Sequence, residues 1–285
     1  MYLVLFYKNE KIISINEIVS ISSTPSKNKT APKTIKNPSI VVLPFKNLGG
    51  SNEQDYLVDG ITEDIITDLS RISTLSVLAS NTSFQYKGKP WTYESISSEL
   101  NITHLLEGSI IFSGDQVRIS VRLVDANNQE SIWGQRYNQK AARLFDIQNN
   151  LTTNIVNSLS IELTKEEKTS LEHPTTDNFQ AYDKYLQGRR LLSQRTKKSN
   201  ELAQQQYEEA IKLDPNFARA YGALAVSKII SANNFWTENH IEEKNQALKL
   251  ALKATSLNEK SQNNYWALGF THLYRKEYEK AVSAV

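Results

Sequence analysis

The chain has 285 residues, of which 39% are hydrophobic and 22% are charged. This composition supports packed cores and excludes global disorder, and the length favours about two domains of roughly 150 residues each. The sequence has no cysteine, so disulfide scaffolds, thiolate metal sites and a cysteine nucleophile are excluded. The redox compartment stays open, because a chain without cysteine folds equally well in reducing and oxidising surroundings.

The net charge of +2 is unevenly distributed along the chain. Residues 1–38 carry a net charge of +4, residues 39–163 carry −5, and the remainder carries +3. Because an acidic domain repels phosphate backbones, we expect no nucleic-acid binding by this segment.

Residues 1–38 have the composition of a leader and flexible linker. The apolar run Met1–Phe6 is shorter than a membrane-spanning helix or the core of a signal peptide. Residues 22–38 are rich in Ser, Thr, Lys, Asn and Pro, which is typical of a solvated linker. A disordered extension and the outgoing edge of a membrane helix lost by truncation both remain possible interpretations, and no complete membrane span is expected within the chain.

Residues 39–163 have the pattern of an α/β domain. The apolar run Ile40–Leu43 predicts a strand that is buried on both faces. Apolar residues at helical spacing from Val58 to Ile72 predict a helix, whose opposite face carries an acidic cluster from Asp55 to Asp68. We expect this acidic face to be solvated. A second buried strand is predicted at Leu75–Ala79, and a second helix from about Trp91 to Leu100.

The second half of this domain predicts three antiparallel strands and a helix. Apolar residues from Val117 to Leu123 alternate with Arg118, Ser120 and Arg122, which is the period of a half-exposed strand. Turns on either side join it to strands at 105–112 and 130–137, and apolar spacing from Leu144 to Leu163 predicts a long helix. The expected order, β-α-β-α-β-β-β-α, defines a mixed sheet.

Several motifs in this part resemble, in the right order, those of the TolB amino-terminal-like domain of bacteria. They are Ser39-Ile40-Val41-Val42-Leu43-Pro44-Phe45, Asp59-Gly60-Ile61-Thr62-Glu63-Asp64, Ser83-Phe84-Gln85-Tyr86-Lys87-Gly88, Leu106-Glu107-Gly108-Ser109, Arg118-Ile119, Leu123-Val124-Asp125, Trp133-Gly134-Gln135-Arg136-Tyr137 and Phe145-Asp146-Ile147-Gln148. The resemblance implies a non-catalytic module. Such modules follow a class III nucleotide cyclase domain or a winged-helix DNA-binding domain, often beyond a membrane helix, and precede helical repeats.

Residues 177–285, after a linker at 164–176, are identified as about 2.5 tetratricopeptide repeats, so the expected fold is an α/β mixed-sheet domain followed by an all-α solenoid. Ala203, Tyr207, Ala210 and Pro215 match the second helix of such a repeat. Ala203 and Ala225 are 22 residues apart, as are Ala247 and Gly269, as a 34-residue repeat requires. The chain stops inside the second helix of the third repeat without a polar cap, which favours a truncated fragment.

Repeat geometry implies that the first helix of each repeat faces a ligand groove. The positions that match this groove are Tyr182, Tyr185, Arg189, Arg219, Val226, Trp266 and Phe270. Aromatic residues and arginine are favoured at interface hot spots, although packing between repeats is an alternative role for the aromatic residues. A protein or peptide partner in this groove is therefore expected.

No catalytic, cofactor-binding or metal-ligating motif is found. The four histidines are isolated in sequence, the acidic cluster lacks the spacing of a calcium loop, and no phosphate-binding glycine loop is present. Arg118 and Arg122 are expected to form ion pairs within the domain, with partner recognition as the alternative.

The sequence therefore predicts a non-catalytic interaction or sensor segment of a bacterial signalling or regulatory protein. The alternatives are the regulatory part of an adenylate cyclase whose catalytic domain lies elsewhere, and the corresponding part of a winged-helix transcription regulator. A small-molecule-binding α/β domain is a further possibility. The expected location is either the periplasmic face of the inner membrane or the cytoplasm of a bacterium.

Overall fold

The structure is a computed structural model that describes residues 37–50, 52–172 and 176–284. The expectations for the leader therefore lie outside the described residues, except for its last two positions. No helix in these described ranges is long and apolar enough to cross a membrane.

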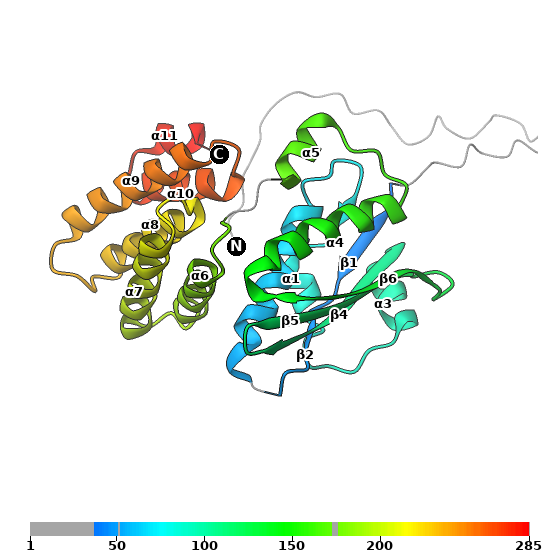
Figure 1. Ribbon diagram of the computed structural model, residues 1–285. Coiled ribbons are helices and arrows are strands. Elements are labelled where there is room, and N and C mark those ends of the chain that lie inside the picture. The colour runs from blue at the N-terminus through cyan, green and yellow to red at the C-terminus, as the bar shows by residue number, and fades with distance from the viewer. Residues whose placement is uncertain (1–36, 51, 173–175, 285) are drawn as a thin grey trace, which may run out of the picture. The chain divides into compact units, whose positions relative to one another are not determined.

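A mixed sheet forms the centre of the first part of the chain (Figure 1). Its strands follow the spatial order β3-β1-β4-β5-β6, and β2 pairs with β4. Strand β1 runs parallel to β3 and β4, whereas β4, β5 and β6 form an antiparallel meander. The expected mixed α/β domain is thus confirmed. The strand bounds are β1 Ser39–Val42, β2 Lys46–Asn47, β3 Ser76–Val77, β4 His104–Ser113, β5 Gln116–Asp125 and β6 Ser131–Lys140.

Helices cover both faces of strand β1. Ile40 and Val42 join the cluster formed with α1 (Asp55–Leu69) and α4 (Leu144–Ser158). Val41 and Leu43 face the opposite side, where they pack against Ile96 of α3 (Tyr93–Leu100). The apolar run was therefore correctly predicted to be buried on both faces. The short elements of this part are η1 Asn52–Gln54, α2 Ser80–Phe84 and η2 Ala141–Arg143.

Two predicted elements differ from the structure. Strand β3 is shorter than predicted and is not fully buried, because it lies at the edge of the sheet with Ser76 exposed and Val77 half-buried. Helix α4 ends at Ser158 and not at Leu163, because Ser160 adopts a left-handed φ of 54°. Leu163 still packs against the core from outside the helix.

A helical region follows the α/β part. It begins with α5 (Lys165–Glu172), which falls within the predicted linker at 164–176. Consecutive helices then pack in pairs: α6 with α7, α8 with α9, and α10 with α11. Their bounds are α6 Phe179–Leu192, α7 Lys197–Leu213, α8 Ala218–Asn233, α9 His240–Leu257, α10 Gln262–Tyr274 and α11 Tyr278–Ser283.

Side-chain caps fix where several of these helices begin, and small residues let the paired helices pack closely. Asn178, Thr196 and Ser261 each cap the helix that they precede by accepting a hydrogen bond from its first turn. Gly188 permits the close approach of α6 and α7, since a Cβ atom there would lie 2.5 Å from the Tyr207 ring.

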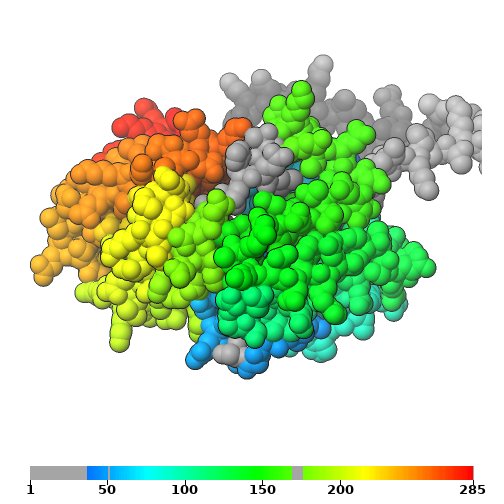
Figure 2. All heavy atoms as spheres, in the orientation of Figure 1, coloured from blue at the N-terminus to red at the C-terminus, as the bar shows by residue number. Residues whose placement is uncertain are grey.

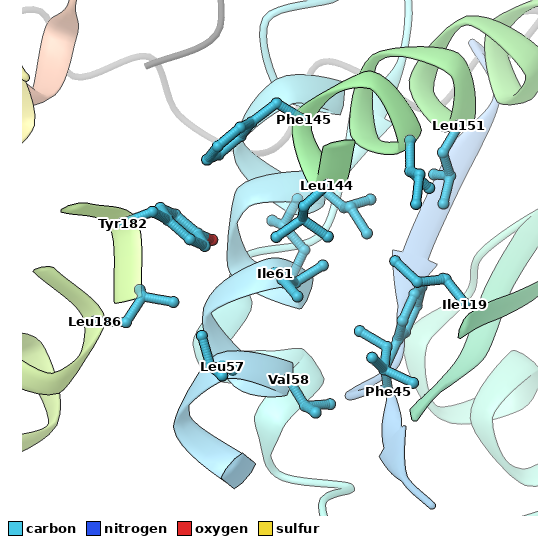
Figure 3. Packing of buried hydrophobic residues seen from close by; sticks show 14 of the residues in the cluster. Phe45, Leu57, Val58, Ile61, Ile119, Leu144, Phe145, Leu151, Tyr182 and Leu186 are labelled. Carbon is cyan, nitrogen blue, oxygen red and sulfur yellow. The ribbon is translucent and has the colours of Figure 1, made fainter. Parts of the chain in front are cut away.

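Helix α6 packs against the α/β part through a shared apolar core. Figure 3 shows Tyr182 and Leu186 facing Leu57 and Ile61 of α1, with Phe145 of α4 beside them. The rings of Phe145 and Tyr182 meet edge to face, with centroids 5.3 Å apart. Atoms of α4 and α6 are also adjacent on the surface in Figure 2. The domain boundaries expected from the sequence remain a prediction, because this core includes residues from both parts.

Candidate functional site

A cavity of about 410 Å³ lies where the first helices of the three pairs meet α1. Helices α6, α8 and α10 supply most of its wall, and α7 adds Tyr207. Helix α1 supplies Glu63, Asp64 and Thr67. The volume falls in the range of known ligand pockets, about 300–1,000 Å³. This groove cavity is the candidate functional site.

The structure brings five of the seven predicted groove residues to this cavity. The five lining residues are Tyr185, Arg189, Arg219, Val226 and Trp266. Tyr182 is fully buried under α1 and does not line the cavity, whereas Phe270 lies next to it by stacking on Trp266. That these residues bind a partner remains a prediction.

A buried ion pair connects α1 to α8. An Nη atom of Arg219 donates a hydrogen bond of 2.8 Å to Asp64, whose other carboxylate oxygen accepts one of 2.7 Å from the Tyr182 hydroxyl. The Arg219 side chain is only 12% exposed and that of Asp64 is 9% exposed. Burial alone would lower the pKa of Arg219, but the Asp64 carboxylate raises it well above its ordinary value. Arg219 is therefore permanently charged.

A second ion pair joins α1 to α6. Arg189 forms a salt bridge with Glu63. Tyr185 lies between the two arginines, with the guanidinium carbons of Arg219 and Arg189 lying 5.0 Å and 5.9 Å from its ring centroid. Cation–π contacts of this kind hold both arginine side chains in place. The two arginines of the groove are therefore charge-matched by carboxylates of α1.

The other end of the cavity is aromatic and open. Trp266 is 53% exposed, and its ring stacks on that of Phe270 at a centroid distance of 5.1 Å. Tyr274 continues the aromatic row one helical turn further on. The part of the Trp266 ring that Phe270 leaves exposed is a flat apolar surface.

The acidic face of α1 was wrongly expected to be solvated. Asp64 is buried, and Asp59 and Glu63 are half-buried beside Lys87 and Arg189. This side of α1 is therefore a second buried face of the helix. The sequence held a signal for it, because Leu57, Gly60 and Asp64 recur at helical spacing. In the structure Gly60 lies against Leu186 of α6. Tyr207, which also lines the cavity, was predicted only as a position in the second helix of a repeat.

The other expectations concern charge pairs and metals. Arg122 pairs with Glu107 of the neighbouring strand at 3.5 Å, which is the expected pairing within the domain, while Arg118 is exposed. Across the residues that the structure describes, no group of three or more His, Cys, Asp or Glu side chains is placed to hold a metal ion.

Comparisons with known proteins relate this chain to regulatory and signalling proteins. Residues 36–154 match the model of a family described as "HilA/YgeH-like transcriptional regulator, second domain". A protein of Rhizobium meliloti (strain 1021) named "Putative adenylate cyclase 3" is 33% identical over 253 residues, which are 89% of this chain and 43% of that protein. The chain thus spans less than half the length of this relative.

Two solved structures match part of the chain. TolB from Acinetobacter baumannii is 20% identical, with 43% of this chain and 28% of that chain covered and a TM-score of 0.33. Lipoprotein GNA1162 from Neisseria meningitidis is 16% identical, with 42% of this chain and 99% of that chain covered and a TM-score of 0.33.

Proposed function

We propose that this chain is a non-catalytic regulatory segment of a bacterial signalling protein, and that its helical pairs are tetratricopeptide repeats whose groove binds a protein partner. In this proposal residues 39–163 form the α/β domain and residues 177–285 form the repeats. The binding surface is the groove cavity together with Trp266 and Phe270.

The repeat assignment is supported by small residues that are buried where paired helices pack. Ala203, Ala225 and Ala247 are fully buried, and Gly188 contacts Tyr207 closely. Small side chains at these positions let paired helices approach, which is the packing that a tetratricopeptide repeat requires.

The convergence of five predicted groove residues on one cavity carries the binding proposal. These residues come from α6, α8 and α10, and they were selected by repeat position alone. Aromatic and arginine side chains around a concave surface are typical of interface hot spots. The exposed Trp266 is the strongest candidate for the anchor of a partner.

Selection from a random dodecamer peptide library displayed on phage would test the proposal. The full chain is the bait, and a Trp266→Ala variant is compared with Tyr278→Ala, which removes a 60% exposed aromatic residue on α11 outside the cavity. We expect the selected phage to bind the wild type and Tyr278→Ala and to lose binding to Trp266→Ala. Selected phage that bind all three proteins equally would contradict the proposal.

A second candidate function is the regulatory part of an adenylate cyclase, which is favoured by the similarity over 253 residues. The match at residues 36–154 favours a transcription regulator instead. In both cases this chain itself is expected to be non-catalytic. Incubation of the purified chain with ATP and Mg²⁺ or Mn²⁺ tests this point, because cyclic AMP formation above that of a heat-denatured control would contradict a non-catalytic role.

A further inference from the structure

Strands β5 and β6 have one covered face and one exposed face. Side chains on the covered face, such as Ile119, join the apolar core with α1 and α4. The strand register places Arg118, Arg122, Arg136 and Lys140 together on the opposite face, and all four are exposed. These four residues define the basic sheet face.

Most of the charge on the basic sheet face is unpaired. Arg122 forms a salt bridge of 3.5 Å with Glu107, the acidic residue that β4 places on this side. Among the residues that the structure describes, Arg118, Arg136 and Lys140 have no carboxylate at salt-bridge distance, and β6 contains no acidic residue. The face is therefore positive although residues 39–163 carry a net charge of −5, and it attracts anionic groups.

Strand β6 is also an edge of the sheet. It is the last strand in the spatial order, and within the described part of the chain it pairs only with β5. It is ten residues long and contains no proline. In an antiparallel pair, alternate residues direct N–H and C=O away from the partner strand, so β6 presents a row of backbone donors and acceptors to solvent. Gly134 is exposed, and because it has no side chain, this exposure is that of the backbone.

A second copy of the chain is a poor occupant of this edge. Two β6 strands paired with each other would bring the side chains of Arg136 and Lys140 from both copies together, with no carboxylate on β6 to offset them. Like charges on adjacent strands are destabilising, and charged edge residues of this kind keep sheets from joining.

A nucleic acid is disfavoured by the lack of stacking groups. Single strands bind surfaces that combine cations with exposed aromatic rings. The aromatic residues of β6, Trp133 and Tyr137, lie opposite Leu123 and Ile119 on the covered side, and β5 has no aromatic residue. A nucleic acid would also leave the backbone row of β6 unused, whereas an extended peptide would pair with it.

We infer that β6 and the basic sheet face bind an extended acidic segment of a partner protein, which adds to the sheet as a strand beside β6. Its backbone continues the hydrogen-bond ladder. Every second side chain of an extended segment lies on the same face, so Glu or Asp at these positions pairs with Arg136, Lys140 and Arg118. None of these three residues lines the groove cavity, so the inference goes beyond the proposed function and does not depend on it.

Fluorescence anisotropy with labelled decapeptide mixtures tests the inference on the full chain. The acidic mixture has Glu at every second position and Thr or Val between, and in the reference mixture Gln replaces Glu. We expect the acidic mixture to bind at least about tenfold more tightly than the reference mixture. A labelled oligothymidylate dodecamer is the nucleic-acid probe and should bind more weakly than the acidic mixture.

Two double variants separate the basic sheet face from general attraction by charge. Arg118→Gln/Arg136→Gln removes two exposed charges of the face and should weaken binding of the acidic mixture about three- to tenfold. The matched control Lys197→Gln/Lys198→Gln removes two exposed charges of α7 and should leave binding unchanged. Trp266→Ala should also leave it unchanged, because this residue lies at the groove cavity.

Hydrogen exchange with mass spectrometry distinguishes strand addition from contact through charges alone. In the free protein, the N–H groups of β6 that point away from β5 should exchange rapidly. With the acidic mixture bound, exchange across residues 131–140 should slow, because these groups then donate to the added strand.

The possible outcomes also separate this inference from the groove proposal. Unchanged exchange at residues 131–140, equal weakening by both double variants, or no preference for the acidic mixture would overturn the inference and leave the groove proposal standing. Tighter binding of the oligothymidylate would assign the face to nucleic acid and overturn it as well. If Trp266→Ala abolishes binding of the acidic mixture, the peptide occupies the groove, which overturns the inference and supports the groove proposal.

Discussion

Arg219 and Asp64 are the residues on which the contact between α1 and α8 depends most directly. Both are almost fully buried, and Asp64 is also held by Tyr182. Removing one member of such a pair leaves an uncompensated charge in the interior. We therefore expect Arg219→Met to lower the free energy of unfolding by about 3–5 kcal/mol, measured by urea denaturation.

The double variant Asp64→Asn/Arg219→Met is the control for this prediction. It removes both charges, so part of the lost stability should return. The loss in free energy of unfolding of the double variant is compared with the sum of the losses of the two single variants. A loss greater than this sum would contradict a buried ion pair at this site.

Asp68 gives α1 a dependence on pH. Burial raises the pKa of this carboxyl to about 6, although Arg71 acts in the opposite direction. The ionised form is thus disfavoured in the folded state. The resulting loss of stability is absent below about pH 4, grows between about pH 4 and 6, and is constant above about pH 6. Asp68→Asn should therefore raise the free energy of unfolding at pH 7 by about 1–3 kcal/mol.

Urea denaturation of both proteins between pH 4 and 7 measures this effect. The stability difference between variant and wild type should grow as the pH rises from about 4 to 6. A difference that is constant over this range, or that falls, would contradict the raised pKa of Asp68.

At the scale of helices, two glycines each allow another helix to approach closely. They differ in the side chain that an added Cβ atom would meet. A Cβ atom at Gly188 of α6 would meet the ring of Tyr207, which is fixed between α6 and α7. A Cβ atom at Gly60 of α1 would meet the methyl groups of Leu186, which form the end of a flexible side chain and not a rigid ring. The two substitutions by alanine form a matched pair, since both glycines lie inside helices.

We expect Gly188→Ala to lower stability by about 1–3 kcal/mol, because overpacking outweighs the higher helix propensity of alanine. Gly60→Ala should cost less than half as much. Thermal unfolding followed by circular dichroism gives both values. Equal effects at the two positions would show that the α6–α7 crossing is not limited by the Tyr207 ring.

The elements that sequence patterns predict well are those with clear periodicity. The alternation around Ile119 and the apolar run at Ile40 correctly located β5 and β1. Strand β2 and helix α2 were missed because two and five residues are too short to show a period. The end of α4 was missed because Leu159 and Leu163 keep the helical spacing beyond the break at Ser160.

The sequence patterns predicted only part of the groove, because they report local spacing and not contacts between distant segments. Repeat spacing selected Tyr185, Arg219 and Trp266, which the structure brings to one cavity. The contribution of α1 was not foreseen, because Asp64 and Arg219 are 155 residues apart and local periodicity carries no information on contacts at that separation.

At the scale of the molecule, residues 37–285 form one compact unit. Its main apolar cluster includes Ile61 and Phe145 from the α/β part and Tyr182, Tyr207 and Phe217 from the helices. Because this core is shared, we expect the two parts to unfold in one transition. Hydrogen exchange with mass spectrometry in increasing urea should give the same midpoint for peptides from β5 and α8, and two separate midpoints would contradict a shared core.

The central claim is that a protein partner binds along α8 and α10 at the groove cavity. Isothermal titration calorimetry of a phage-selected peptide against three proteins, the wild type, Trp266→Ala and Tyr278→Ala, tests it most directly. We predict that Trp266→Ala raises the dissociation constant at least about tenfold, as expected for an interface hot spot, and that Tyr278→Ala leaves it unchanged. A dissociation constant that is unaffected by Trp266→Ala, or equally raised by both substitutions, would contradict the claim.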